Sequence, residues 1–315
     1  MEPKLPSHDA LKAALQRNLI FVSGKGGVGK TAVSQAIALA LSRQPATGRA
    51  AGRVLWVTFE DPTRPRGELI QRGPRLWHLN CDATLAFEEY ASMKIGVAAL
   101  TRIFLQNKVM RYLAKAAPGI HELVLLGKVW FERRNYDHVV VDMPSTGYGL
   151  AMFQSTENFS RLFRGGPLNR DAEEMLATFS DPKVCSQLIV SLPEEMPLRE
   201  SLELEEFLLK LFPKNQPGFI LNRRFPHVTA EADEKTSPPD SWPGPLAGSA
   251  EDYARKRSIL EAWNLKLWES RGVRYGELGF VPYSPDPSDP DGREGFDEDR
   301  LAEALAREIT RRHLA

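Results

Sequence analysis

The chain has 315 residues, and its 41 lysines and arginines balance its 41 aspartates and glutamates. This neutral balance gives no sign of the basic stripe that nucleic-acid binding requires, so we expect no nucleic-acid partner. No stretch approaches the roughly 18 to 20 apolar residues that cross a bilayer, and the polar start lacks the apolar core of a signal peptide. We therefore expect a cytoplasmic protein without direct membrane insertion.

The first elements along the chain predict a strand, a glycine-rich loop and a helix in succession. Residues 7–16 open with capping side chains and predict a short helix. The apolar run 18–24 ends in glycine and predicts a buried strand, and the alanine- and leucine-rich stretch 30–43 predicts a helix. The loop between them, from Gly24 to Thr31, has the sequence GKGGVGKT.

Five more short apolar runs predict further strands. Their apolar residues are continuous rather than alternating, which is typical of strands that are covered on both faces in a parallel sheet. The runs are 53–59, 138–143, 187–192, 218–222 and 277–282, and helical stretches such as 198–211 separate several of them. We therefore predict one α/β domain over residues 1–315, a phosphate-loop NTPase with a mostly parallel sheet covered by helices.

Four segments depart from this alternation. Two helical segments at about 83–118 and 148–179 predict a helical layer inserted into the domain. Their apolar residues either form a groove for an apolar client helix or pack on the core, and both alternatives stay open. Stretches rich in proline, glycine and charge at about 226–249 and 284–299 predict flexible surface loops. The tail at 297–315 has helical spacing and mixed charge, which favours a docked helix over a membrane anchor.

The loop GKGGVGKT fits the phosphate-binding pattern G-x-x-x-x-G-K-[ST], and the flanking strand and helix supply the context that the motif requires. Glycines let backbone N–H groups point at phosphate oxygens, and the positive end of the following helix adds to the attraction. Lys30 would reach the β and γ phosphates of ATP, and Thr31 would offer its hydroxyl to Mg²⁺. The expected nucleotide contacts are Gly24, Gly26, Gly27, Val28, Gly29, Lys30, Thr31 and Ala32.

Acidic residues at two predicted strand ends complete the expected catalytic site. Asp142 closes the run 138–143 and would hold the magnesium ion through water, or else it caps the next turn. Asp61 follows the run 53–59 and is the first candidate to orient the attacking water, with Glu60 in reserve. An ordinary Asp-Pro turn is the alternative there. Because parallel strands end at one edge of a sheet, these acids should lie near the phosphates.

Together with further segments, the loop is similar to the deviant phosphate loop of the dimeric ATPases that include ArsA, Get3, MinD, ParA and the nitrogenase iron protein. The segment DMPSTGYGL, at 142–150, resembles the DTAPTGHTL switch II of the ArsA/Get3 branch. LNCDATLAFEEY, PGIHEL and SLPEEMPLRES are similar to other stretches of that branch, in the same order along the chain. The resemblance runs from about residue 18 to residue 285 and implies an ArsA/Get3-like ATPase.

In that family two subunits face each other across two nucleotides, so the resemblance implies further roles. Lys25, the second lysine of the loop, would reach the phosphates bound by the partner, much as an arginine finger does. Asp61 matches the switch I aspartate, which favours it over Glu60. Asn222 and Pro282 fall where the branch contacts adenine. The resemblance thus implies ATP or ADP with Mg²⁺ as ligands, and the implied catalytic residues are Lys25, Lys30 and Asp61.

Departures from the family pattern bear on how two subunits would pair. The stretch 252–263 lacks the zinc-binding C-x-x-C of the members that handle membrane-protein tails, so zinc-bridged pairing is not expected. Cys81 and Cys185 are far apart in sequence, supply no arsenite-binding cluster, and are expected to be reduced structural thiols. Arg64 and Pro65 replace the usual His-Asn after switch I. The expected dimer is therefore either a homodimer or a heterodimer with a related ATPase.

The resemblance favours an ATPase whose ATP-driven closure handles a hydrophobic client helix or regulates a membrane protein. A positioning ATPase of the MinD/ParA kind is an alternative, which the mixed charge of the tail and the neutral composition disfavour. A partner subunit that hydrolyses ATP weakly is another alternative, which the altered switch I keeps open.

Overall fold

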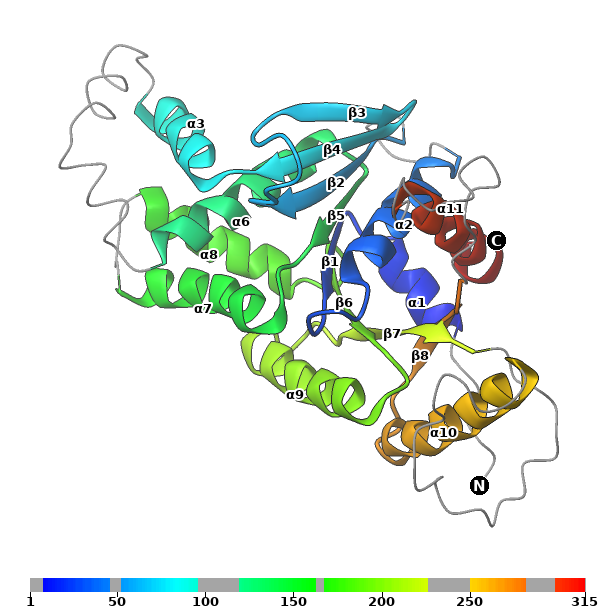
Figure 1. The fold of residues 1–315 in the computed structure, drawn as a ribbon. Coiled ribbons are helices and arrows are strands. Elements are labelled where there is room, and N and C mark those ends of the chain that lie inside the picture. The colour runs from blue at the N-terminus through cyan, green and yellow to red at the C-terminus, as the bar shows by residue number, and fades with distance from the viewer. Residues whose placement is uncertain are drawn as a thin grey trace.

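A computed structural model describes residues 8–45, 52–95, 119–162, 167–225, 250–281 and 298–314. An eight-stranded sheet runs through the middle of the molecule, with helices on both of its faces (Figure 1). The strand order is β3-β4-β2-β5-β1-β6-β7-β8. Neighbouring strands are parallel except for β3 and β4, which run antiparallel. The α/β class with a mostly parallel sheet is therefore confirmed.

The strands are β1 (Leu19–Ser23), β2 (Val54–Phe59), β3 (Leu69–Gly73), β4 (Leu76–Cys81), β5 (His138–Asp142), β6 (Cys185–Ser191), β7 (Gly218–Arg224) and β8 (Tyr275–Gly279). The sequence predicts six of these to within three residues at either end, but it predicts neither β3 nor β4. β3 is largely exposed and carries Gln71 and Arg72, while β4 includes the polar His78 and Asn80. Neither is a continuous apolar run, so the pattern that identifies the central strands does not detect the edge strand β3 or its neighbour β4.

Alternate residues of the strands point to opposite faces of the sheet and build two separate cores. In β1, Leu19 and Phe21 belong to the larger core, whereas Ile20 and Val22 belong to the smaller one. The smaller core is covered by α1 (His8–Leu15), α2 (Lys30–Ser42), α11 (Glu298–Ile309) and the terminal turn η2 (Thr310–Leu314). The larger core is covered by α3 (Ala83–Ile95), α6 (Ile120–Glu132), α7 (Thr146–Leu162), α8 (Pro167–Ser180), α9 (Glu195–Leu211) and α10 (Ala250–Ser270).

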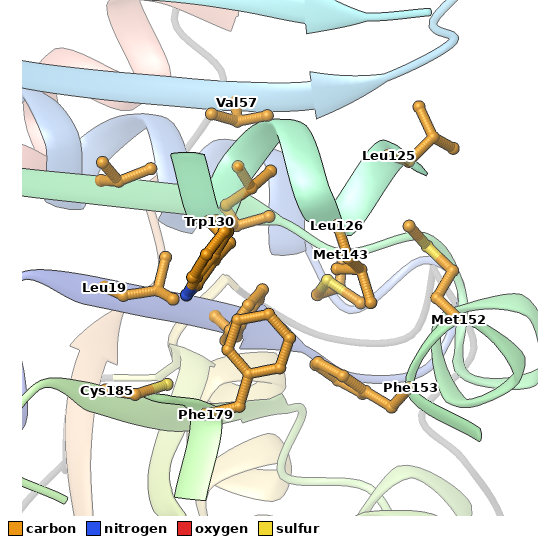
Figure 2. Packing of buried hydrophobic residues seen from close by; sticks show 14 of the residues in the cluster. Leu19, Val57, Leu125, Leu126, Trp130, Met143, Met152, Phe153, Phe179 and Cys185 are labelled. Atoms are coloured by element: carbon orange, nitrogen blue, oxygen red, sulfur yellow. The ribbon is translucent and has the colours of Figure 1, made fainter. Parts of the chain in front are cut away.

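Aromatic side chains hold the helices of the larger core against β1. Phe21 meets Phe153 and Phe179 edge-on, with ring centroids 5.1 Å apart in each pair. Phe153 also meets Phe212, at the end of α9, at 5.3 Å. Figure 2 shows Trp130, Met143 and Met152 in the same core as Phe153 and Phe179. Because β1 leads directly into the glycine-rich loop, this packing fixes the base of that loop.

The predicted helical insertion at 148–179 lies mainly in α7 and α8. Its residues Met152, Phe153 and Phe159 are buried in the larger core. For these three residues the structure shows core packing rather than the wall of a groove.

Several predicted segments lie outside the described residues, namely 96–118 of the first helical insertion, the loop 226–249 and residues 284–297. The predicted tail helix is α11, which begins at Glu298 and packs on α2 with Leu305 and Ile309 buried. Within the described ranges, no helix is long and apolar enough to cross a membrane.

Candidate active site

The glycine-rich loop connects β1 to α2 and requires glycine for steric reasons at both of its ends. Gly24 has a φ of +150°, and a Cβ atom there would collide with the carbonyl oxygen of Val190 in β6. Gly29 has a φ of +88°, and a Cβ atom there would lie 2.5 Å from the side-chain amide of Asn222. The glycines therefore let the loop turn tightly over the carboxyl ends of β1, β6 and β7.

Lys30, Thr31 and Ala32 form the first turn of α2, as the motif predicts. The ammonium of Lys30 folds back over the loop and donates to the carbonyl oxygen of Lys25 at 2.9 Å. Burial lowers the pKa of Lys30, and the nearby charge of Asp142 partly offsets this effect. Lys30 thus lies partly desolvated beside the loop, where an anion would gain more from it than from a hydrated lysine.

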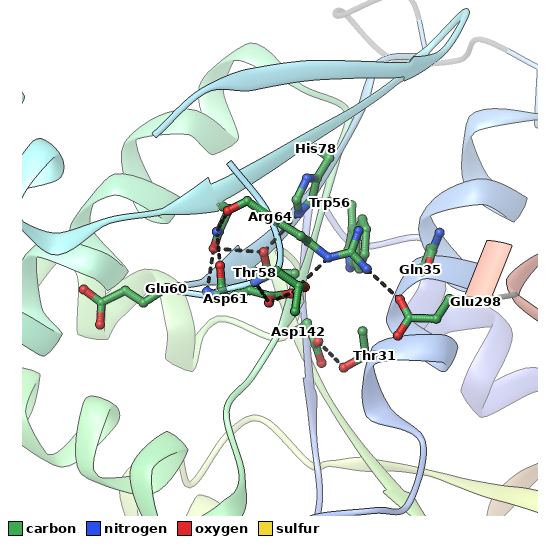
Figure 3. Close-up of polar contacts among 12 residues, drawn as sticks. Thr31, Gln35, Trp56, Thr58, Glu60, Asp61, Arg64, His78, Asp142 and Glu298 are labelled. Atoms are coloured by element: carbon green, nitrogen blue, oxygen red, sulfur yellow. Dashed lines mark hydrogen bonds and ion pairs between the residues drawn. The ribbon is translucent and has the colours of Figure 1, made fainter. Parts of the chain in front are cut away.

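Thr31, in the first turn of α2, meets Asp142 at the end of β5. The Thr31 hydroxyl donates to Asp142 Oδ2 at 2.6 Å (Figure 3). Burial raises the pKa of Asp142 to about 6, against the hydrogen bond from Thr31 and the charge of Lys30. Its Oδ1 atom is buried and has no hydrogen-bond partner among the described residues.

This pair fits a magnesium ion, because both side chains present hard oxygen ligands and one carboxylate oxygen lacks a partner. Thr31 would bind the ion directly, and Asp142 would hold it through water. Bound there, the ion would neutralise charge on the phosphates.

Glu60 and Asp61 follow β2 and point in different directions (Figure 3). Glu60 has a φ of +48°, and its carboxylate contacts His121 in α6 at 3.0 Å. Asp61 instead accepts bonds within its own turn, from the Thr63 hydroxyl at 2.6 Å and from Arg64 Nε at 3.0 Å. The charge of Asp61 contributes to the raised pKa of Asp142.

Asp61 is held by its neighbours rather than free. Burial would raise the pKa of Asp61, but hydrogen bonds from Thr63 and Arg64 outweigh it and lower the pKa. Arg64 also bonds Glu298 at the start of α11 at 2.8 Å, and its guanidinium lies 4.9 Å from the centre of the Trp56 ring. The arginine that replaces the family's His-Asn thus ties this turn to the C-terminal helix.

Asn80 in β4 is a positioning residue that sequence reasoning missed. It is fully buried and accepts from the backbone N–H of Asp61 at 3.0 Å. Its amide donates to the carbonyl oxygens of Asp61 and Arg64 at 2.9 and 3.1 Å. One side chain therefore fixes the turn that carries Asp61. Its only sequence signal was a place in the LNCDATLAFEEY segment, since β4 itself was not predicted.

Lys25 forms an ion pair with Glu200 in α9, with 2.5 Å between Nζ and Oε1. The lysine and glutamate side chains are 41% and 30% exposed. The other oxygen of Glu200 is buried without a hydrogen-bond partner in the described part of the chain. In this single chain Lys25 therefore has a partner of its own, which the sequence did not predict although Glu200 lies in the SLPEEMPLRES segment.

Asn222 lies in β7 beneath the loop. Its amide donates to the carbonyl oxygen of Val28 at 2.9 Å, and its own oxygen accepts from the N–H of Arg223. Pro282, the other residue expected at adenine, lies outside the described residues. The adenine contact of Asn222 and Pro282 stays a prediction.

Cys81 and Cys185 are buried free thiols. Burial raises the pKa of Cys81 to about 12, and it also raises the pKa of Cys185. Among the described residues no group of three or more His, Cys, Asp or Glu side chains could hold a metal ion. Both thiols thus lie in the unreactive, structural setting that the sequence predicts.

Comparison with known proteins agrees with this architecture. Residues 17–165 match the anion-transporting ATPase family. The chain is 30% identical over 231 residues to the ATPase BagA of Mycobacterium tuberculosis, which covers 66% of this chain and 65% of that protein. It is 27% identical over 158 residues to a putative arsenical pump-driving ATPase of Aquifex aeolicus, covering 44% of this chain and 50% of that protein.

The chain thus spans 65% of the length of BagA and 50% of that of the Aquifex protein. The family match over residues 17–165 contains the glycine-rich loop, the Asp61 turn and Asp142. The family match and these relatives support the assignment of this chain to the ArsA-like ATPase family.

Proposed function

We propose that this protein binds ATP with Mg²⁺ at the glycine-rich loop and hydrolyses it. The observation that carries this proposal is the meeting of Thr31 with Asp142 at 2.6 Å beside the partly desolvated Lys30. A tetrahedral phosphate group would replace the carbonyl of Lys25 as the partner of Lys30. The loop N–H groups and the start of α2 would add further donors.

Asp61 is the residue that we propose to orient the attacking water. Its carboxylate now accepts from Thr63 and Arg64, so hydrolysis requires this turn to rearrange when nucleotide binds. The bond from Arg64 to Glu298 would transmit that rearrangement to α11. Glu60 faces His121, which makes it the less suitable of the two carboxylates.

We further propose that the working unit is a dimer, formed with a second copy or with a related ATPase. Lys25 would leave Glu200 and reach the phosphates bound by the partner. Its ion pair is half exposed, so breaking the pair costs about 1 kcal/mol or less. That cost is small enough for nucleotide-driven closure to supply.

The same reasoning suggests what the closure acts on. A cavity of about 250 Å³ lies between α3, α6 and α8, and its walls are mainly apolar. Its lining includes Met93, Leu123, Trp130, Phe131 and Met175. An apolar side chain of a client helix or of a membrane protein suits such a cavity. We therefore propose that the ATPase handles a hydrophobic client or a membrane partner.

The test compares two carboxylate variants, Asp61→Asn and Glu60→Gln, in phosphate release and in light scattering with Mg²⁺ and ATP. We expect Asp61→Asn to bind ATP, to lose turnover and to accumulate as a dimer, while Glu60→Gln stays close to the unmodified protein. Loss of turnover in Glu60→Gln alone would reverse the assignment of the two acids. A monomer under every nucleotide condition, alone and with a related ATPase, would refute the dimer.

A further inference from the structure

A polar pocket lies at the amino ends of the strands, on the opposite side of the sheet from the end that carries the glycine-rich loop. It has a volume of about 540 Å³ and is built around Asn18, Arg53, Arg133, Arg134, Tyr136 and Asp137. Asn18 precedes β1, Arg53 precedes β2, and Asp137 precedes β5. The same three strands end at the loop, at Asp61 and at Asp142. Strands of this length, at about 3.3 Å per residue, separate the two edges by roughly 16–20 Å.

The pocket has an excess of positive charge. Within the described residues, none of the guanidinium groups of Arg53, Arg133 and Arg134 forms an ion pair. Among the described residues of the lining, Asp137 is the one carboxylate, and it accepts from the N–H of Gly52 at 2.6 Å.

Carboxylates beside the pocket do not cancel this excess. Glu132 is bonded by Lys128 at 2.8 Å and by Asn135 at 3.1 Å. The charge of Glu174 favours the cation of Arg133, but burial and the neighbouring Arg134 outweigh it and lower the pKa of Arg133. Because Glu132 is already engaged and Glu174 does not offset the lowered pKa of Arg133, the pocket stays positive and attracts an anion.

The arginines are held in place by aromatic rings rather than by acids. The Arg53 guanidinium lies 4.8 Å from the centres of both the Trp77 and the Tyr136 rings. Those of Arg133 and Arg134 lie 5.4 and 4.9 Å from the centre of the Trp130 ring. Stacking of this kind restricts the side chain and leaves the N–H edge of the guanidinium available for a bidentate acceptor.

The backbone around these side chains is fixed as well. The amide of Asn18 donates to the carbonyl oxygens of Arg133, Tyr136 and Asp137 at 3.2, 2.8 and 3.1 Å. The turn η1 (Arg133–Asn135) is therefore tied to the start of β1. The pocket is preorganised, so a ligand would pay little to order its walls.

Two of the guanidinium groups also bury a nitrogen atom without a hydrogen-bond acceptor among the described residues. The Nε atoms of Arg53 and Arg133 are buried and have no hydrogen-bond partner among the described residues. Burial without an acceptor disfavours a cation, because hydration is lost and nothing replaces it. An oxyanion seated among the guanidinium groups would supply the missing negative charge.

From these features we infer that the pocket at the amino ends of the strands binds a small oxyanion at Arg53, Arg133 and Arg134. Such an oxyanion is a metabolite that bears phosphate or carboxylate groups. The volume suits a small molecule rather than a bare ion. This site is separate from the nucleotide site and does not depend on the proposed ATPase activity.

The test is calorimetric titration of the full chain with pyrophosphate and, in a parallel arm, with citrate. Because the glycine-rich loop also attracts phosphates, the titration is run in a Lys30→Ala background, which weakens that loop. We expect saturable binding to persist there and to weaken at least about tenfold when Arg133→Gln and Arg134→Gln are added. The matched control is Arg271→Gln with Arg311→Gln, which removes two exposed arginines elsewhere and should change the affinity less than about twofold.

Hydrogen exchange locates the ligand independently of any substitution at the arginines. We expect pyrophosphate or citrate to slow the exchange of backbone amides in residues 130–138. If only one of the two compounds binds to saturation, that compound shows which kind of oxyanion the site prefers. Circular dichroism and the melting temperature verify that each variant is folded. Absence of binding in the Lys30→Ala background, unchanged affinity in the arginine variant, or protection confined to residues 24–31 would each overturn the proposal.

Discussion

The two ends of β1, β2 and β5 differ in how their charged side chains are compensated. At the carboxyl end Lys25 is paired with Glu200, Asp61 with Arg64, and Asp142 with the Thr31 hydroxyl. At the amino end the arginines stack on aromatic rings and form no ion pair within the described residues. A ligand at the carboxyl end must therefore displace existing contacts, whereas a ligand at the amino end would add contacts that are missing.

From this difference we propose that the carboxyl end acts as a switch and the amino end as a fixed receptor. Contacts that must be broken make binding depend on a rearrangement, which is what couples a nucleotide to a change of shape. A preorganised pocket binds without such a change. Substitutions at the carboxyl end should thus alter turnover and dimer formation, while substitutions at the amino end should leave both intact.

The largest effect is expected from Lys30→Ala. Removing a cation that would contact the transferred phosphate should lower ATP turnover by about 10²–10³-fold. Phosphate release under saturating Mg²⁺ and ATP measures the turnover. The control is Arg134→Gln at the amino end, which should keep turnover within about twofold of the unmodified protein. If Lys30→Ala keeps its ATP turnover within about threefold of the unmodified protein, the glycine-rich loop is not the catalytic phosphate-binding site.

The next effect concerns the buried carboxylate at the carboxyl end. Because burial raises the pKa of Asp142 to about 6 in the folded chain, folding favours its protonated form. The stability of the nucleotide-free protein should therefore fall as pH rises from about 4 to 6 through this group. Asp142→Asn removes that loss, so it should be more stable by about 2–3 kcal/mol at pH 7 and nearly equal below pH 4.

Urea unfolding at a series of pH values between 4 and 8 measures the gap between Asp142→Asn and the unmodified protein. The same variant should respond less to Mg²⁺ in ATP binding, since a carboxylate that would hold the ion is gone. A gap that is constant over the whole pH range would show that Asp142 has an ordinary pKa.

At the amino end we expect a change in stability without a change in turnover. Asn18→Ala removes the amide that bonds three carbonyl oxygens, which should cost about 1–2 kcal/mol of unfolding free energy. The matched control is Asn135→Ala, which removes one bond from an exposed amide and should cost less than about 0.5 kcal/mol. Denaturation curves measure both variants, and a large loss of turnover in Asn18→Ala at full folding would contradict the division between the two ends.

Sequence reasoning succeeds where the chemistry is local or follows from the sheet. The loop, Lys30 and Thr31 are adjacent in sequence, so one motif predicts them together. Asp142 lies 111 positions from Thr31, yet parallel strands bring both ends to one edge. The central strands are predictable because both of their faces are buried.

It fails where a partner is set by tertiary packing alone. Asn80 fixes the Asp61 turn from β4, a strand whose polar residues His78 and Asn80 interrupt the apolar run that would have revealed it. The opposite directions of Glu60 and Asp61 depend on the positive φ of Glu60, which no residue preference indicates. Glu200 lies 175 positions from Lys25, and only the packing of α9 brings them together.

The Lys25–Glu200 pair gives the smallest expected effect and the sharpest test of the switch. Glu200→Gln should change the unfolding free energy by less than about 1 kcal/mol, because both side chains are partly exposed. It should strengthen ATP-dependent dimer formation about two- to fivefold, since Lys25 would leave a neutral partner at less cost. Sedimentation in Mg²⁺ and ATP measures this, with Glu203→Gln on the same helix as the charge-matched control. If Glu200→Gln weakens the dimer, or if Glu203→Gln strengthens it equally, the pair does not restrain Lys25.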